Sequence, residues 1–291
     1  MDSPGFLLLG TGLGLGLNFP LGKLAFAAGF AAPVWAAFIS LGAGLVLLVV
    51  ASQSEAWPQD KLGLIRFSFL SGFLSFVMPN LITFTVIPKI GSGLTGLMFA
   101  ISPMMTALLS WAFNVRPPNK LTLMAIGLGF IGAVVIVFGK DGGVGGGISP
   151  WLLLALCIPF FLAAGNLYRS LGWPKDAGPR LLGSLTNLSA VPFLLIVALL
   201  LHGTIDLAPF GQAPLLAFSQ LLASSLMFML FFRLQQVGGP TYLSQIGYVG
   251  AAVGLFAGVT FLGESYPVEV WIGAAIIAVG ISLSTYASTR G

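Results

Sequence analysis

The chain has 291 residues, of which 57% are hydrophobic and only 7% are charged, and its mean hydropathy is +1.02. A soluble domain carries about 25% charged residues, so this composition excludes a water-soluble protein and predicts an all-α integral membrane protein. The net charge of +4 comes without any basic run, so we expect no nucleic-acid partner. One cysteine, Cys157, and one histidine, His202, cannot build an internal disulfide or a metal site, and we expect no cofactor.

Ten apolar segments follow one another along the chain, each long enough, at about 20 residues, to cross a bilayer. Polar or turn-rich stretches such as SQSEAWPQDK, VRPPNK and KDGGVGGGISP separate most of them. The opening MDSPG lacks the basic residues of a signal peptide, so we expect the first segment to be retained. The predicted spans are residues 5–26, 33–51, 63–86, 91–112, 121–139, 150–171, 180–201, 213–235, 241–262 and 267–287.

The basic residues predict the orientation of these spans, because Lys and Arg are enriched on the cytoplasmic side. With the N-terminus inside, the outer side holds only Lys23, Lys89 and Lys140. The inner loops and the C-terminal end hold the other nine basic residues: Lys61, Arg66, Arg116, Lys120, Arg169, Lys175, Arg180, Arg233 and Arg290. Both termini are therefore expected to be cytoplasmic.

The chain also resembles itself when it is shifted by 148 residues. The residues that align are Asn18 with Asn166, Ala125 with Gly273 and Gly132 with Gly280, and FNVRPP falls within one residue of FLGESYP. This predicts two domains of five spans each, residues 1–145 and 146–291. Since five is odd, the second copy enters the membrane from the opposite side. Such inverted repeats are a recurring plan of secondary transporters, with the substrate site between the halves near the bilayer midplane.

Two segments, IGSGLTGLMFAISPMM through VIVFG at 90–139 and QVGGPTYLSQIGYVG through GISL at 236–283, resemble the ends of the two repeats of EamA-type transporters of the drug/metabolite transporter superfamily. The matching residues are Pro103, Ala125 and Gly132 in the first half, and Gly263, Glu264, Gly273 and Gly280 in the second. The family's GER-like turn is incomplete in both halves, since the first reads NVR and the second GES. The segment LNFPLGKLA also resembles the first helix of the family.

The resemblance covers nearly the whole chain. It implies ten transmembrane helices in two inverted five-helix repeats and the export of small metabolites across a bacterial inner membrane. Within the superfamily the chain is similar to the YddG-type exporters of aromatic and other neutral amino acids, which makes amino acids the expected substrates. We expect the protein to function as a monomer.

All eight acidic residues fall in loops or at span ends, and His202 lies at a span end as well. Proton relays usually need an ionisable group within the membrane, so we expect facilitated diffusion or exchange rather than proton coupling. The same distribution leaves no catalytic pair within the spans, so we do not expect an enzyme.

Neutral polar and aromatic residues within the spans are the candidates for a binding site. The candidate substrate-binding residues are Asn18, Lys23, Asn80, Phe84, Phe99, Ser102, Asn166, Gln245 and Tyr248, and the candidate gating or kink residues are Pro20, Pro79 and Pro103. Asn18 and Asn80 share a depth of roughly 20 Å from the inner surface, and Asn166 lies near the mirrored depth. Such a set suits a zwitterion with an apolar side chain.

Each candidate also has a structural interpretation. An asparagine can bridge two helices, which is worth about 0.6 kcal/mol on average. The prolines can simply shape the helices, and Phe99 or Tyr248 can be ordinary packing. Lys23 can extend to the interface, or it can face the cavity as the single candidate cation.

Three other functions are alternatives to amino-acid export. A channel would show a continuous polar stripe or a charged ring, and no span offers one. A nucleotide-sugar or phosphate-ester carrier would need several inward-facing cations. A base or drug exporter of the same superfamily is the remaining alternative.

Overall fold

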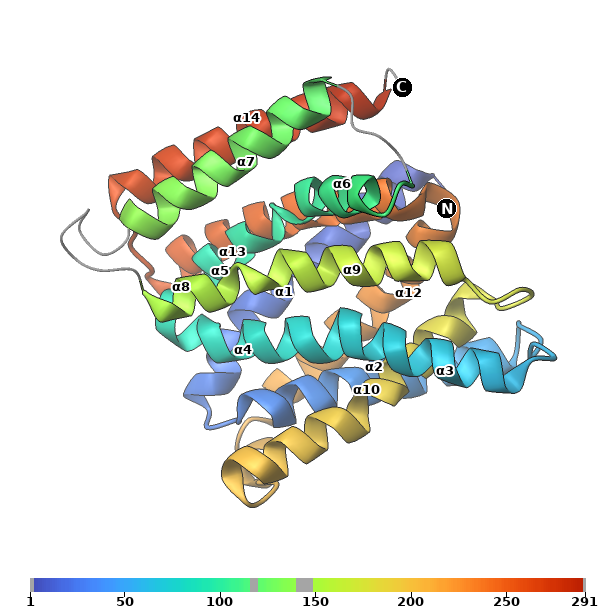
Figure 1. Ribbon diagram of the computed structural model, residues 1–291. Coiled ribbons are helices and arrows are strands. Elements are labelled where there is room, and N and C mark those ends of the chain that lie inside the picture. The colour runs from blue at the N-terminus through green and yellow to red at the C-terminus, as the bar shows by residue number, and fades with distance from the viewer. Residues whose placement is uncertain (1–2, 116–119, 140–148, 290–291) are drawn as a thin grey trace.

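The computed structural model describes residues 3–115, 120–139 and 149–289, and the described chain is all helical apart from its turns (Figure 1). The elements are α1 (Pro4–Ala27), α2 (Ala32–Ser52), α3 (Lys61–Gly72), the π-helix η1 (Phe73–Val77), α4 (Met78–Ile90), α5 (Ser92–Phe99), α6 (Ser102–Ala112), α7 (Lys120–Gly139), α8 (Pro150–Ala155), α9 (Cys157–Gly172), α10 (Pro179–His202), α11 (Ala208–Gln212), α12 (Pro214–Ser244), α13 (Ile246–Leu262) and α14 (Val268–Thr289).

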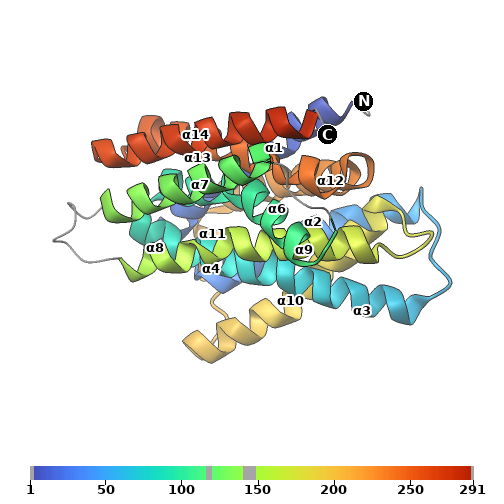
Figure 2. The same cartoon turned by 45° about the horizontal axis from the view of Figure 1, so that its top comes forward.

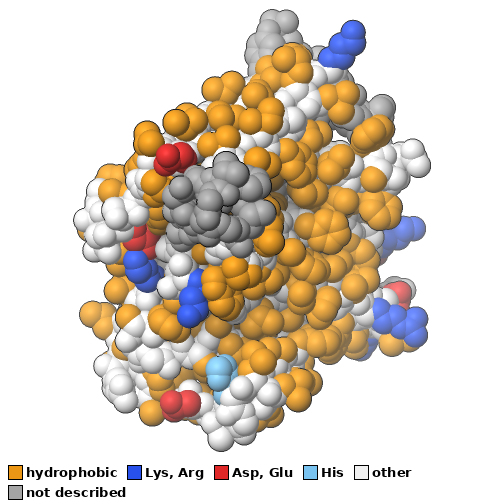
Figure 3. Space-filling model, turned by 60° about the vertical axis from the view of Figure 1, so that its left-hand side comes forward, with side chains coloured by type: hydrophobic (Ala, Val, Ile, Leu, Met, Phe, Trp, Pro, Cys, Tyr) orange, Lys and Arg blue, Asp and Glu red, His pale blue; other side chains and the backbone are white. Residues whose placement is uncertain are grey.

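Within the described residues, seven helices are long and apolar enough to cross a membrane, and three shorter apolar helices complete the set. Each overlaps one of the ten expected spans, which confirms an all-helical, multi-pass membrane protein. The surface agrees, because hydrophobic side chains make up most of the face in Figure 3 and the charged groups are few. Large apolar side chains such as Leu200 and Phe261 are more than three-quarters exposed, which is stable only in lipid.

Prolines interrupt three of the spans. A proline has no N–H, and its ring clashes with the carbonyl group four residues earlier. Pro79 follows the π-helical stretch η1, where the Met78 N–H reaches back to the Phe73 carbonyl oxygen. Pro103 lies just after the break between α5 and α6, and Pro159 just after the break between α8 and α9. Helix α1, by contrast, continues through Pro20 to its end.

Equivalent helices of the two halves pack on one another: α2 against α10, α5 against α13 and α7 against α14 (Figures 1 and 2). A Cβ atom on Gly132 would lie 2.7 Å from the carbonyl oxygen of Gly273, and one on Gly273 would lie 2.7 Å from that of Gly132. Further along, Gly280 approaches the carbonyl oxygen of Ala125. Helices α7 and α14 therefore run antiparallel, and the Ala125/Gly132 pair of one helix faces the Gly273/Gly280 pair of the other, with Gly132 opposite Gly273 and Ala125 opposite Gly280.

The turns repeat as well. Seven described residues have positive φ angles, and six of them form pairs at nearly the same shift. The pairs are Gly29 with Asp176 (176 − 29 = 147), Gly91 with Gly239 (239 − 91 = 148) and Asn114 with Gly263 (263 − 114 = 149). Gly239 has φ 69° and ψ −174° and turns α12 between the eighth and ninth expected spans. The backbone therefore carries the duplication even where the side chains differ.

The chain begins and ends at the same end of the bundle (Figure 1). We call this the termini end, and the opposite end, where α1 ends and α14 begins, the far end. Which end faces the cytoplasm stays a prediction. The expected domain boundary at 145/146 and the basic residues Arg116, Lys140 and Arg290 lie outside the described residues.

Candidate functional site

A small cavity lies inside the bundle between the two halves. The first half contributes residues of α1, η1, α4, α5 and α6, and the second half contributes residues of α9, α12 and α13. Its polar lining residues are Ser75, Asn80, Ser102, Asn166 and Ser244, and its aromatic ones are Phe76, Phe99, Phe228 and Phe231. Its volume is about 60 Å³, which is room for only a few water molecules.

Four of the nine expected substrate-binding residues line this cavity, namely Asn80, Phe99, Ser102 and Asn166, and the kink residue Pro79 lines it too. The Nδ2 atom of Asn80 is buried and has no hydrogen-bond partner among the described residues. A buried donor without a partner costs about 1–3 kcal/mol, so this position favours a bound polar group. A proline removes the N–H that would bond to the carbonyl group four residues earlier. For Pro79 and Pro103 those earlier residues are Ser75 and Phe99, and both of them are in the cavity wall.

Asn18 lies one layer behind the cavity. Its Oδ1 accepts a hydrogen bond of 2.6 Å from Nε2 of Gln220, and its Nδ2 donates to the Gly14 carbonyl oxygen at 2.8 Å. The same Nδ2 approaches the sulfur of Met227, which lines the cavity, at 3.6 Å. In this conformation Asn18 bridges α1 and α12.

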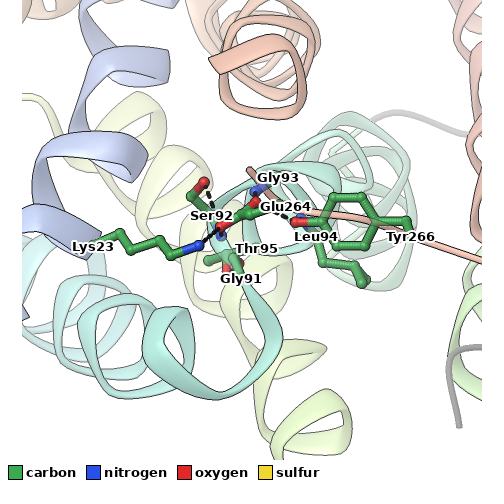
Figure 4. Close-up of polar contacts among 8 residues, drawn as sticks. All are labelled: Lys23, Gly91, Ser92, Gly93, Leu94, Thr95, Glu264 and Tyr266. Atoms are coloured by element: carbon green, nitrogen blue, oxygen red, sulfur yellow. Dashed lines mark hydrogen bonds and ion pairs between the residues drawn. The ribbon is translucent and has the colours of Figure 1, made fainter. Parts of the chain in front are cut away.

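Lys23 belongs to a polar cluster at the far end (Figure 4). Its Nζ lies 2.6 Å from Oε1 of Glu264 in an ion pair. The Glu264 carboxylate also accepts hydrogen bonds from the backbone N–H groups of Ser92, at 2.7 Å, and Gly93, at 3.0 Å. It therefore caps the first turn of α5, where a negative charge is favoured by the helix dipole. The hydroxyl of Tyr266 donates to the same carboxylate.

These bonds set the charge of the cluster. Burial alone would raise the pKa of Glu264, but the hydrogen bonds from Lys23, Tyr266, Ser92 and Gly93 outweigh it and lower the pKa to about 2. Burial and the neighbouring carboxylate raise the pKa of Tyr266, so its hydroxyl stays protonated and donates. Glu264 is thus ionised at neutral pH and joins α1 to the start of α5.

An aromatic layer separates this cluster from the cavity. Phe19 is fully buried, and its ring centre lies 5.0 Å from that of the cavity residue Phe99 in an edge-to-face contact. Gly96 and Gly254 leave room for the Phe19 ring. The cavity is therefore closed toward the far end by packed rings, and then by the Lys23–Glu264 pair.

The remaining expected residues lie outside the lining. Phe84 is buried on α4 and packs where Gly22 of α1 leaves space. Gln245 and Tyr248 are half-buried at and just after the junction of α12 and α13.

Arg169 is buried, although the distribution of basic residues predicts a position at the inner surface. It is 1% exposed and lies within α9, three residues after Asn166. Its Nε donates to Oε1 of Gln235 at 2.6 Å, its Nη2 donates to Oδ1 of Asn166 at 2.7 Å, and its Nη1 donates to the hydroxyl of Ser75. The available signal was an arginine inside the predicted span 150–171, although its partners Ser75 and Gln235 are too distant in the sequence to be foreseen.

The EamA-like transporter family matches residues 3–138 and 149–286, so one copy of its repeat covers each half of the chain. The chain belongs to the EamA-like transporter family. This EamA-like protein is therefore a transporter and not an enzyme, as expected. Among solved structures 27 chains match it. One crystal structure has a TM-score of 0.68 at 15% identity, over 98% of this chain and 97% of the other, which shows the fold alone. No curated protein matches the chain.

The family match places the central cavity between two copies of the repeat. Each half of the chain contributes one family repeat, and the cavity lies between them, with Asn80 from the first copy and Asn166 from the second in its wall. A small-molecule substrate and a lipid bilayer are the partners that family membership supports.

Proposed function

We propose that this transporter exports amino acids, aromatic and other neutral ones, and related small metabolites across a bacterial inner membrane. The observation that carries the proposal is the cavity between the repeats. Its walls are mostly apolar and aromatic, while a few amides and hydroxyls, including the unsatisfied amide of Asn80, interrupt them. Amides can bind the charged ends of a zwitterion, and the phenylalanine rings can accept an apolar or aromatic side chain.

Transport by this site requires a change of conformation. The space in the cavity suits a few water molecules, so an amino acid enters only when one end opens. At the far end, opening would separate Lys23 from Glu264 and Phe19 from Phe99. We therefore propose alternating access by rocking of the repeats, with the far end facing outward and both termini in the cytoplasm.

The energy source proposed is the substrate gradient itself, by facilitated diffusion or exchange. No carboxylate or histidine is among the described residues that line the cavity. The buried carboxylate of Glu264 lies at the far end, and its pKa of about 2 keeps it ionised at physiological pH. A proton carrier would need a group that titrates near neutral pH.

The test is uptake of radiolabelled phenylalanine and leucine into proteoliposomes that contain the purified full chain, with and without an imposed pH gradient. We expect saturable uptake that is the same in both conditions. Uptake that stops when the pH gradient is removed would contradict the proposed energetics, and absence of uptake would contradict the substrate class.

A variant with Asn18, Asn80 and Asn166 all replaced by leucine tests the site. Asn80 and Asn166 line the cavity and Asn18 supports its wall, so we expect transport to be lost. Unchanged transport by the triple variant would contradict a site at this cavity.

A further inference from the structure

The guanidinium of Arg169 is a cation buried in the interior of the bundle. It is 1% exposed, and no carboxylate of the described residues pairs with it. Its hydrogen-bond acceptors are the neutral side chains of Gln235, Asn166 and Ser75. A buried cation without a counter-ion is energetically unfavourable, and ionisable groups within a membrane usually mark a functional site.

The acceptors hold the guanidinium in one place. Gln235 donates its own Nε2 to the backbone carbonyl oxygen of Asn166 and to the hydroxyl of Ser170, both at 3.3 Å. This fixes the amide so that Oε1 turns toward Arg169. The rings of Phe231 and Phe232 lie 5.1 and 5.9 Å from the guanidinium carbon. The cation is therefore preorganised rather than loosely accommodated.

Three of the residues that contact Arg169 also line the cavity, namely Ser75, Asn166 and Phe231. Asn166 turns its carbonyl oxygen to Arg169, so its NH₂ group remains, and that group donates to no described residue. The guanidinium has five N–H donors, and three of them donate to described residues. The groups left available at this part of the wall are donors next to a positive charge.

We propose that Asn166 and Ser75, with Arg169 behind them, form an anion subsite that binds the carboxylate of the transported molecule. This inference rests on the proposed function, because it specifies which end of the substrate the cavity selects. A carboxylate matches the donors, and it supplies the missing counter-ion in a water-poor site where a charge-assisted hydrogen bond is strong. The carboxylate then lies toward the termini end of the cavity, since Arg169 is three residues before the last residue of α9.

The test compares three probes that share a phenylethyl group: phenylalanine, 3-phenylpropionate, which lacks the amine, and phenethylamine, which lacks the carboxylate. Binding to the purified full chain is measured by thermal stabilisation, and transport is measured in proteoliposomes. In the wild type we expect both carboxylates to bind about 10- to 100-fold more tightly than phenethylamine, the range for a charged hydrogen bond of about 1.5–3 kcal/mol. Equal binding of phenethylamine and phenylalanine overturns the inference, and so does a failure of both carboxylates to bind.

Two variants test whether Arg169 and Asn166 are responsible for the preference for carboxylates. Arg169→Gln should abolish the preference for carboxylates, and retention of the preference overturns the inference. Asn166→Asp is the second variant, because it keeps the size of the side chain and gives Arg169 an internal carboxylate. We expect it to fold, to unfold at a higher temperature than the wild type and to bind both carboxylate probes about tenfold or more weakly. If Asn166→Asp binds them as tightly as the wild type, the subsite does not exist.

Arg66→Gln is the matched control, since it removes the same charge from an exposed position on α3. It should leave the ratio of the three affinities unchanged, and a change equal to that of Arg169→Gln would overturn a local subsite. The result also separates the two proposals. Binding of 3-phenylpropionate that depends on Arg169, without transport of phenylalanine, supports the subsite and contradicts amino-acid export. Transport of phenylalanine without any preference for carboxylates supports amino-acid export and contradicts the subsite.

Discussion

At the residue scale, the charged groups of the interior divide into two kinds. Glu264 meets both a cation and backbone donors, and it therefore stabilises one arrangement of α1 and α5. Arg169 meets neutral acceptors alone among the described residues, and its charge remains available to a ligand. The carboxylate of Glu264 thus stabilises the closed far end, and the guanidinium of Arg169 lies next to the cavity wall.

Loss of the ion pair should open the far end. Ser102→Cys in a Cys157→Ser background places one thiol in the cavity wall, where a membrane-impermeant thiol reagent can report access. We expect Lys23→Ala to increase the labelling rate of this thiol several-fold, because α1 is then no longer held to Glu264. Lys89→Ala is the control, since it removes an exposed lysine from the same end. Equal labelling rates in the Lys23 and Lys89 variants would contradict a closing role for the pair.

The pH dependence of the same contact follows from the pKa of Glu264. Folding lowers this pKa from 4.5 to about 2, so the charged form contributes stability above about pH 4.5, and the contribution is lost as the pH falls toward 2. We expect the melting temperature in detergent to be insensitive to Glu264 ionisation from pH 5 to 8. Below about pH 4.5 it should fall more steeply in the wild type than in Glu264→Gln. Parallel pH profiles for the two proteins would contradict this assignment.

At the element scale, the broken helices and the close helix pairs have different tasks. The breaks at Pro79 and Pro103 lie beside the cavity, where the backbone must leave space and free polar groups. The pair of α7 and α14 packs through small residues, as membrane helices do when their backbones approach closely. We infer that this pair is a structural unit rather than part of the site.

A methyl group in that contact should therefore cost stability. In Gly132→Ala the new Cβ would lie 2.7 Å from the Gly273 carbonyl oxygen, so the two helices must move apart. We expect the free energy of unfolding to fall by about 1–3 kcal/mol, the usual cost of overpacking. Gly127→Ala is the matched control on the same helix, because its Cβ would meet nothing within 4 Å. It should be neutral or slightly stabilising, and equal losses for both variants would refute the contact.

At the scale of the whole molecule, much of the fold could be predicted from the sequence. Hydropathy predicted all ten spans, because a bilayer demands long apolar segments whatever their partners. The 148-residue repeat predicted which residues are equivalent, and its Ala125/Gly132 pair indeed faces its Gly273/Gly280 pair. The cavity was predicted in part, because intramembrane amides such as Asn80 and Asn166 are conspicuous among apolar neighbours.

The rest could not be predicted, because it depends on contacts between distant segments. Lys23 and Glu264 are 241 positions apart, and Arg169 and Gln235 are 66 positions apart. An arginine two residues from the end of a predicted span looks the same in the sequence whether it faces water or the interior. Its burial follows from the packing of α9 against α12 and η1, which hydropathy does not encode.

If a small molecule crosses through the cavity between the repeats by alternating access, internal substrate should drive the entry of external substrate. Counterflow measures this exchange: proteoliposomes are loaded with unlabelled phenylalanine, and the entry of external labelled phenylalanine is followed over time. We expect a transient accumulation of label above equilibrium in the wild type, and its loss when Asn80 and Asn166 are both replaced by leucine. Entry that does not saturate and is not stimulated by internal substrate, or full counterflow by the double variant, would contradict alternating access through this cavity.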